Sequence, residues 1–276
     1  MDHFLHMHKK KYRNQRKKLK ELLKRDEYRF KVGNKVTDRR LRKFWNRRKS
    51  LFSLVDKGNI YLTDELWYSV TPEVMAKFIA KFIKACIPEA TTVLDVFCGG
   101  GGNSIQFAKV FDKVYGVDLN LDHLYCTYKN AQAYNVIDRI WLKYGDWVEI
   151  AKKGRFQDVK IDCIFASPPW GGPEYLKQEK FDLEKSLIPV PLSDALASFF
   201  KLCSNVVMFL PKNSDLAQLS EITARLLGPD AKCKVLYMKK EGWLQGLMCF
   251  WGKAFYEYPT SDAEERAPKR CELDYD

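Results

Sequence analysis

From residue 71 onwards, apolar strand-like runs alternate with segments that keep the period of a helix. Alternation of this kind favours an α/β fold with a doubly wound, mostly parallel sheet, whose ligands lie at the carboxyl ends of the strands. Seven strands are predicted, at 91–97, 113–118, 139–144, 161–166, 205–210, 232–240 and 246–256. Helices are predicted near 103–111, 120–134, 192–204 and 214–227. Only a short turn separates the last two strands, so we expect one of them to run antiparallel.

A helix start precedes the first of these strands. Thr71 offers a capping hydroxyl, Pro72 suits the first helical position, and apolar residues keep the helical period as far as Cys86. We therefore predict that Thr71 caps a helix, and that the main domain begins near Trp67.

The net charge of +12 is concentrated at the N-terminus. Residues 1–50 contain 20 Lys and Arg against 5 Asp and Glu, whereas the rest of the chain contains 27 against 30. Such a block pairs naturally with phosphates, although a solvated tail that aids solubility or nuclear import would have the same composition. Residues 9–31 predict a basic helix or a disordered arm, and 38–54 predict an amphipathic helix that packs its aromatic face on the main domain. We expect four parts: a basic arm at 1–34, helical or disordered, an amphipathic helical extension at 35–66, the main domain at 67–256 and a mobile tail at 257–276.

Composition excludes several classes of protein. A hydrophobic share of 46% indicates a globular chain, and no apolar run is long enough to span a membrane. Eight cysteines without a C-x-x-C pair indicate reduced thiols in an intracellular protein and argue against a metal site. We interpret the small cluster of His3, His6 and His8 as part of a frayed terminus.

A glycine-rich loop, Cys98 to Asn103, follows the first predicted strand. A dinucleotide site would need G-x-G-x-x-G to hold a pyrophosphate, but Ser104 replaces the third glycine and Asp95 precedes the loop. An anion is unfavourable beside a phosphate and favourable beside the ammonium group of S-adenosylmethionine. Asp118 and Asp146 end the next two strands, where they suit ribose hydroxyls and an adenine amino group. Three acids in this order favour S-adenosylmethionine over NAD or a purely structural turn.

The run Ser167-Pro168-Pro169-Trp170 follows the fourth predicted strand. Each proline fixes φ at about −65° and lacks an N–H, so the carbonyls point outward as acceptors. The Ser167 oxygen and the Pro168 carbonyl suit the two hydrogens of an amine, which leaves the nitrogen lone pair free to attack a methyl group. Trp170 suits stacking on a base, most strongly on a cationic one such as 7-methylguanine. The alternative is a plain turn at a strand end.

Several runs together resemble the trimethylguanosine synthases, the RNA cap hypermethylases, over about residues 43–255. They are Lys43-Phe44-Trp45, Leu51-Phe52-Ser53, Trp67 to Glu73, Asp95 to Gly99, Gly101 to Ala108, Ser167 to Pro173 with Tyr175, and Phe209 to Asn213. The resemblance implies a Rossmann-like class I methyltransferase with a basic helical extension. It implies that S-adenosylmethionine converts the 7-methylguanosine cap of small nuclear and small nucleolar RNAs to 2,2,7-trimethylguanosine, by two successive SN2 methylations of the N2 amine. We further expect a nuclear, nucleolar monomer that meets ribonucleoprotein core proteins and uses neither metal nor membrane.

The resemblance also assigns roles to single residues. The donor would contact Asp95, Gly99, Gly101, Asn103, Asp118, Asp146 and Thr71, with Phe52 closing over it. Ser167, Pro168 and Trp170 would be catalytic. The substrate would contact Trp170, Asn130 at an edge of the base, Tyr175, and the phosphate-binding Lys43, Lys212, Arg47 and Arg48. Lys212 stands where this family commonly carries Arg, which weakens a bidentate phosphate contact.

Two rival functions remain open from the residues. A methyltransferase for N2 of guanine or N6 of adenine inside RNA or DNA would need base flipping and would ignore a free cap. A catalytically idle cap- or RNA-binding protein would not need three acids at strand ends. Simpler interpretations of single residues are core packing for Phe52, a helix-surface position for Asn130 and a solvated charge for Lys43.

Overall fold

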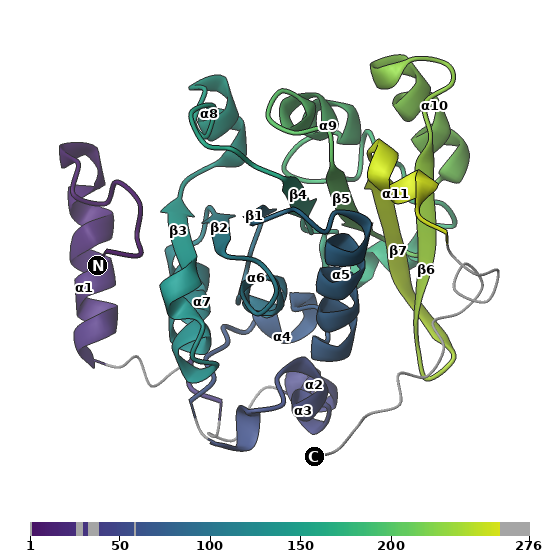
Figure 1. The fold of residues 1–276 in the computed structure, drawn as a ribbon. Helices are drawn as coiled ribbons and strands as arrows, with labels where there is room; N and C mark the ends of the chain where they lie inside the picture. Colours follow the sequence, from purple (N-terminus) through teal and green to yellow (C-terminus); the bar gives the residue numbers. More distant parts are fainter. Residues whose placement is uncertain (1, 26–29, 33–38, 58, 260–276) are drawn as a thin grey trace. The chain divides into compact units, whose positions relative to one another are not determined.

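The computed structural model describes residues 2–25, 30–32, 39–57 and 59–259, which fall into two units divided between Asp162 and Cys163 (Figure 1). Seven strands form one mostly parallel sheet, so the predicted α/β fold is confirmed. The first unit contains β1 (Thr92–Val96), β2 (Lys113–Asp118) and β3 (Ile140–Tyr144). The second contains β4 (Cys163–Ala166), β5 (Val206–Leu210), β6 (Cys233–Lys240) and β7 (Trp243–Trp251).

The three strands of the first unit are parallel, in the order β3-β2-β1. Asp95 lies beside Gly116, and Asp118 lies beside Tyr144, so the carboxyl ends of the strands meet at one edge. The helices between and beside them are α4 (Leu66–Ser69), α5 (Glu73–Cys86), α6 (Gly102–Ala108), α7 (Leu121–Ala133) and α8 (Trp147–Lys152). The sequence did not predict α8, which begins directly after Asp146.

The start of α5 differs from the prediction. Pro72 occupies the N-cap position with ψ 139°, and the helix begins at Glu73. The Thr71 hydroxyl instead accepts a hydrogen bond from Asn103 Nδ2 at 2.9 Å. Thr71 is therefore not the N-cap of α5, because its hydroxyl is hydrogen-bonded to Asn103 of the glycine loop.

The amphipathic helix predicted over 38–54 is broken. The structure has α2 (Arg42–Asn46) and α3 (Arg48–Leu51), because Arg47 leaves the helical region with φ −104° and ψ 13°. Its aromatic side chains do pack inward, with the Trp45 ring 5.7 Å from Trp67 and the Phe44 ring 6.2 Å from Tyr68. The packing of this segment was therefore predicted correctly and its continuity was not.

The N-terminal residues are ordered against the edge of the first unit. Phe4 forms a parallel bridge with Leu142 on β3, and the Leu5 N–H donates to the Leu142 carbonyl at 2.8 Å. Helix α1 (Arg13–Arg25) follows, beside α7 (Figure 1). The interpretation of the histidine cluster as a frayed terminus is therefore wrong, because His3 and its neighbours satisfy the open hydrogen bonds of an edge strand. The predicted tail, 257–276, lies outside the described residues from 260 onwards.

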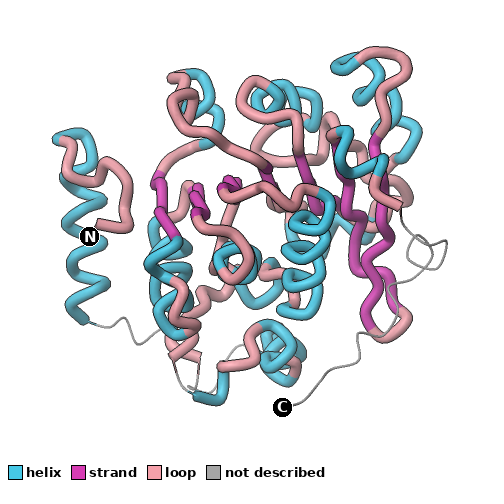
Figure 2. The backbone as a smooth tube through the Cα atoms, viewed as in Figure 1, coloured by secondary structure: helices cyan, strands magenta, loops and turns pink. Residues whose placement is uncertain are grey.

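In the second unit β4 and β5 are parallel, and β7 runs antiparallel to both β5 and β6. Glu241 (φ 51°) and Gly242 (φ 83°) form the tight turn between β6 and β7, which confirms the predicted antiparallel strand. The strand predicted over 246–256 ends at Trp251 and is followed by helix α11 (Lys253–Glu257), as Figure 2 shows. The other helices are the short 3-10 helix η6 (Gly172–Lys177), α9 (Leu192–Phe200) and α10 (Leu216–Leu227). Among the residues described, no helix is long and apolar enough to cross a membrane.

Candidate functional site

Several residues of the glycine loop after β1 adopt the left-handed backbone conformation. Phe97, Gly99 and Gly101 all have positive φ, at 66°, 54° and 82°. A Cβ on Gly101 would stand 2.8 Å from Thr127 Cγ2 on α7. Gly101 is therefore required both by its backbone conformation and by the close approach of α7.

Asp95 is a buried carboxylate that is only partly satisfied. It is 1% exposed, and its Oδ2 accepts a hydrogen bond from Ser104 Oγ at 2.5 Å. Its Oδ1 has no hydrogen-bond partner within the described part of the chain. Burial raises the pKa of Asp95 to about 7, the Ser104 hydrogen bond opposes that rise, and the charge of Asp118 adds to it. Such a group is suited to a cationic ligand, which would stabilise its ionised form.

Asn103 offers a second acceptor in the same loop. Its Nδ2 is held by Thr71, and its buried Oδ1 lacks a partner among the residues described. Buried polar atoms are rarely left unpaired in native proteins. Together with Asp95, this oxygen provides acceptors for an ammonium group, so the residues present fit the amino-acid end of S-adenosylmethionine.

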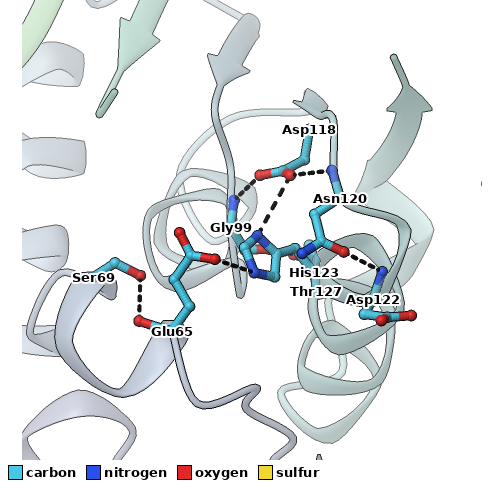
Figure 3. A network of polar contacts seen from close by, with 8 residues as sticks. All are labelled: Glu65, Ser69, Gly99, Asp118, Asn120, Asp122, His123 and Thr127. Atoms are coloured by element: carbon cyan, nitrogen blue, oxygen red, sulfur yellow. Dashed lines mark hydrogen bonds and ion pairs between the residues drawn. The ribbon is translucent and has the colours of Figure 1, made fainter. Parts of the chain in front are cut away.

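Asp118 lies at the end of β2 in a network of polar contacts (Figure 3). Its carboxylate accepts from the Gly99 N–H at 2.9 Å and from the Asn120 N–H at 2.7 Å. The His123 ring stands between two acids, with Nδ1 3.5 Å from Asp118 and Nε2 3.5 Å from Glu65. Burial lowers the pKa of His123, but its hydrogen bond to Asp118 and the charges of Asp118, Glu65 and Asp122 raise it overall.

The His123 ring connects the segment before α4 to the end of β2. Sequence reasoning missed His123 and Glu65, which are 58 positions apart in the chain. Nothing in the local pattern around either residue signals their contact.

Asp146 ends the third strand and caps the next helix. Its Oδ1 accepts from the Val148 N–H at 2.9 Å, which makes it the N-cap of α8. The neighbouring Gly145 N–H donates to the Asp118 carbonyl at 3.1 Å. The three predicted acids are thus brought to one edge of adjacent strands, as the sequence led us to expect.

Phe52 is 1% exposed, and its ring centre lies 6.1 Å from that of Tyr134. The Ser53 N–H donates to Glu73 at 2.5 Å, and the Tyr134 hydroxyl donates to the same carboxylate at 2.7 Å. Burial raises the pKa of Glu73, but the hydrogen bonds from Ser53, Tyr134 and Lys77 lower it overall. Phe52 is therefore firmly anchored, and its closure over a donor stays a prediction.

Asn130 is completely buried and its amide is fully engaged. Oδ1 accepts from the Tyr61 N–H at 2.7 Å, and Nδ2 donates to the carbonyls of Tyr61 and Gly100, both at 2.9 Å. It is thus not the helix-surface residue considered above. These bonds tie the glycine loop to the segment before α4, and they leave no N–H of this amide for the cap base that the resemblance assigned to it.

The basic residues of the extension divide into two kinds. Lys43 and Arg47 are exposed, and Lys43 Nζ lies 4.9 Å from the centre of the Phe44 ring. Arg48 is committed to its own segment, with contacts to the Trp45 carbonyl at 3.2 Å and to Asp56 at 3.4 Å. Lys43 and Arg47 are therefore better placed than Arg48 to meet a phosphate.

The second unit presents Trp170 on a rigid support. The indole N–H donates to the Phe209 carbonyl at 3.3 Å, and the ring packs edge to face against Phe209 at 5.1 Å and Tyr175 at 5.3 Å. Pro168 is buried, whereas Ser167 and Trp170 remain partly exposed. Trp170 is therefore fixed in orientation and still accessible.

Two residues that support Trp170 escaped sequence reasoning. Phe209, on β5, belongs to one of the runs that resemble the family, and Gly246, on β7, belongs to none of them. A Cβ on Gly246 would stand 2.5 Å from Phe209 Cε2, so this glycine makes room for the ring beneath Trp170. A glycine inside a strand indicates a close approach of this kind, and that was the available signal.

Tyr175 and Lys212 lie on two connected segments of the second unit. Gly171 (φ 80°) and Gly172 (φ 73°) turn the chain directly after Trp170 into η6, which carries Tyr175. Asn213 Nδ2 donates to the Tyr175 carbonyl at 3.2 Å, and the adjacent Lys212 is exposed. Ser167, Trp170, Tyr175 and Lys212 are thus held in one unit.

Comparison with known proteins identifies the family. The model for RNA cap guanine-N2 methyltransferases matches residues 90–254, which is more than half of the chain. The chain belongs to this family. It is 52% identical over 256 residues to the trimethylguanosine synthase of Saccharomyces cerevisiae, covering 93% of this chain and 81% of that protein. It is 34% identical over 181 residues to the trimethylguanosine synthase of Schizosaccharomyces pombe, covering 65% of this chain and 74% of that protein.

Solved structures agree on the fold of this family. A putative methyltransferase from Porphyromonas gingivalis W83 aligns with a TM-score of 0.59 at 15% identity, over 81% of this chain and 53% of that one. An O-methyltransferase from Bacillus cereus, solved with SAH, aligns with a TM-score of 0.50 at 14% identity, over 79% of this chain and 92% of that one. At these identities the alignments establish the methyltransferase fold alone.

Proposed function

We propose that this chain is a cap hypermethylase, which uses S-adenosylmethionine to convert a 7-methylguanosine RNA cap to 2,2,7-trimethylguanosine. The observation that carries the proposal is the 52% identity to a trimethylguanosine synthase over 93% of the chain. Small nuclear and small nucleolar RNAs are the substrates we propose. With them we propose a nuclear, nucleolar location, contact with ribonucleoprotein core proteins, and action as a monomer.

Residues of the first unit hold the donor in this proposal. S-adenosylmethionine, when bound, supplies an electrophilic methyl group on a sulfonium. Asp95 and Asn103 accept from its ammonium group, beside Thr71 and the backbone of Gly99 and Gly101. Their unpaired buried oxygens support that role. Asp118 accepts from the ribose hydroxyls, Asp146 accepts from the adenine amino group, and Phe52 packs over the donor.

Residues of the second unit orient the acceptor. The Ser167 oxygen and the Pro168 carbonyl accept the hydrogens of the N2 amine, which leaves its lone pair free to attack a methyl group. After the first transfer one N–H remains, which is enough for a second round in the same orientation. As the nitrogen bonds to the methyl carbon, the methyl–sulfur bond would break and its electron pair would stay on sulfur, which leaves a neutral thioether. The methylated nitrogen is then acidic and loses its proton to water. Positioning, rather than a general base, provides the rate enhancement here.

Trp170 selects the base by stacking on it. The 7-methylguanine ring carries a positive charge that unmodified guanine lacks, and a cation over tryptophan gains about 1–2 kcal/mol in a dry site. The partial exposure of Trp170 and its support by Phe209 and Tyr175 favour this role. Lys43, Arg47 and Lys212 meet the cap phosphates, for which their exposure suits them.

Incubation with labelled S-adenosylmethionine and 7-methyl-GDP tests the proposal. We expect N2-methylated product with 7-methyl-GDP and none with GDP, read out by chromatography of the labelled nucleotide. Methylation of internal guanines or adenines without any reaction on the cap would support the first rival function. No product on any capped ligand would support an idle binding protein.

Substitution of Trp170 isolates the stacking step. Trp170→Ala should abolish binding of 7-methyl-GDP while the affinity for the donor, measured by calorimetry, stays within about twofold, because the donor residues lie in the other unit. Trp170→Phe keeps an aromatic face and should retain part of the cap affinity. Unchanged turnover in the alanine variant would remove Trp170 from the proposal.

A further inference from the structure

Helix α1 has an apolar face and an opposite basic face. Leu19 and Leu22 are buried. Four basic residues recur at the spacing i, i+4, i+7 and i+11, which places them on one side of the helix, directly away from those leucines. We call these four residues, all of them exposed, the basic stripe: Arg13, Lys17, Lys20 and Lys24.

The stripe is anchored to the first unit. Lys18, on the flank of the helix, pairs with Asp122 of α7 at 2.7 Å. Tyr12, just before the helix, lies edge to face with Tyr144 at 6.1 Å, and Lys143 Nζ lies 5.0 Å from the Tyr12 ring centre. Tyr144 ends β3, and Asp122 lies in the first turn of α7, four residues after Asp118. The helix that carries the stripe is therefore held beside the end of β3 and the start of α7 in a fixed orientation.

The stripe carries charge that its surroundings do not neutralise. Residues 9–25 contain ten lysines and arginines and a single acid, Glu21. Glu21 pairs with Arg25 at 3.6 Å, outside the stripe. Within the described ranges no member of the stripe has an ion-pair partner. Exposed charges of one sign, held rigidly in a row, favour a polyanionic partner.

We propose that the basic stripe binds the phosphate backbone of the RNA that follows the cap. The inference rests on the proposed function, which supplies a capped RNA as substrate. The stripe rises about 17 Å along the helix axis, which is long enough to meet several consecutive phosphates. Contacts to phosphates carry no sequence information, so the stripe adds affinity for any RNA chain and leaves specificity to the cap.

RNA suits the stripe better than an acidic protein does. Protein interfaces are built around buried aromatic or apolar anchors, and the charged residues lie at their rim. The exposed face that carries the stripe presents lysines and arginine without such an anchor. A row of cations alone matches a backbone of phosphates, where binding is driven by the release of counterions.

Binding of an uncapped single-stranded RNA of about 20 nucleotides, followed by fluorescence anisotropy, tests the stripe without relying on catalysis. The variant is Lys17→Gln/Lys20→Gln/Lys24→Gln, because Gln keeps the helix propensity and removes the charge. We expect at least about a fivefold loss of affinity, and a plot of log affinity against log salt that is shallower by about 2, from three lost single-strand phosphate contacts. The matched control Lys81→Gln/Lys185→Gln/Lys201→Gln removes the same charge from exposed sites elsewhere and should change both quantities little.

Methylation assays separate this inference from the proposed function. The stripe variant should methylate 7-methyl-GDP like the wild type, while its KM for a capped RNA rises several-fold. An equal loss in the control triple would show that only net charge matters and would overturn the inference. Unchanged RNA affinity in the stripe variant would also overturn it and would leave an acidic protein as the partner. If the wild type binds RNA through the stripe but methylates no cap, the proposed function is wrong and the inference that the stripe binds RNA is retained.

Discussion

At the scale of single residues, Ser104 explains why this loop differs from a dinucleotide site. The position that a third glycine would occupy carries a hydroxyl, and that hydroxyl donates to Asp95 at 2.5 Å. One oxygen of the carboxylate is thereby fixed, and the other is left without a partner among the described residues. The departure from the glycine pattern therefore builds an anionic site where a pyrophosphate site would need neutral backbone.

The raised pKa of Asp95 predicts a pH-dependent affinity for the donor. With a pKa of about 7, the unliganded protein keeps a proton on Asp95 that a cationic ligand must displace. Donor affinity should therefore fall by up to about tenfold per pH unit below pH 7, and level off above it. Calorimetry in buffers of different ionisation enthalpy would detect the released proton.

Two variants control this measurement. Asp95→Asn should bind the donor weakly and without the pH dependence, because no proton is displaced. His123→Gln removes the imidazole beside Asp118, whose pKa is raised, and should keep the dependence due to Asp95. A wild-type affinity that stays constant between about pH 6 and 8 would contradict the assigned role of Asp95.

At the scale of elements, the end of α3 shows a local preference overridden by a distant contact. The spacing of apolar residues predicts a helix as far as Leu54, but α3 ends at Leu51. The Ser53 N–H, which would continue the helix, donates instead to Glu73, which is 20 positions away. A charged acceptor forms a stronger hydrogen bond than a backbone carbonyl, so the chain extends toward Glu73.

Glu73→Ala should release this segment. The change leaves the Ser53 N–H and the Tyr134 hydroxyl without their acceptor, which should cost about 2–4 kcal/mol in the free energy of unfolding, measured in urea. Since the pKa of Glu73 is lowered, its contribution is present above the ordinary carboxyl pKa and is lost as the pH falls through the folded value.

Lys77→Gln is the matched control for Glu73. Lys77 contacts the same carboxylate at 3.1 Å but is half exposed, so its loss should cost less than about 1 kcal/mol. Hydrogen exchange at residues 52–54 should accelerate in Glu73→Ala and not in the control. Equal effects of the two variants would show that the buried hydrogen bonds do not hold this segment.

At the scale of the whole molecule, the N-terminal residues contribute to the core of the first unit. Phe4, Leu19, Val32, Phe52 and Ile60 are all buried. The basic residues that the structure describes before residue 51 therefore belong to segments whose apolar side chains are packed. The division at 34, 66 and 256 stays a prediction, and the structure instead divides the described residues at 162.

A chain that begins at Trp67 should not fold stably. It would lose those buried side chains and the Tyr61 backbone groups that Asn130 binds. Thermal unfolding followed by circular dichroism should lose its cooperative transition, because each large core side chain removed costs about 2–5 kcal/mol against a total stability of about 5–15 kcal/mol. Removal of residues 260–276 serves as the control for truncation. A cooperative transition in the chain that begins at Trp67 would contradict an integral role for the extension.

The architecture and the order of the chemical groups along it could be predicted from the amino-acid sequence. Strand and helix periods are local properties, so the seven strands could be placed to within a few residues at most of their ends. The carboxyl ends of parallel strands meet at one edge, so Asp95, Asp118 and Asp146 were expected together, and they are.

The partners of individual side chains, in contrast, depend on the three-dimensional fold. In the fold, the side-chain amide of Asn130 is hydrogen-bonded to the backbone of Tyr61, 69 positions away, and His123 lies between Asp118 and Glu65. Asp95 is buried with one oxygen unpaired among the described residues, and the His3 ring is hydrogen-bonded to the Ile140 carbonyl of β3, 137 positions away. These contacts join residues that are far apart in the chain, and the sequence around either residue does not predict its partner. Burial and hydrogen bonding depend on which groups meet in space, and the periodicity of a segment does not encode this.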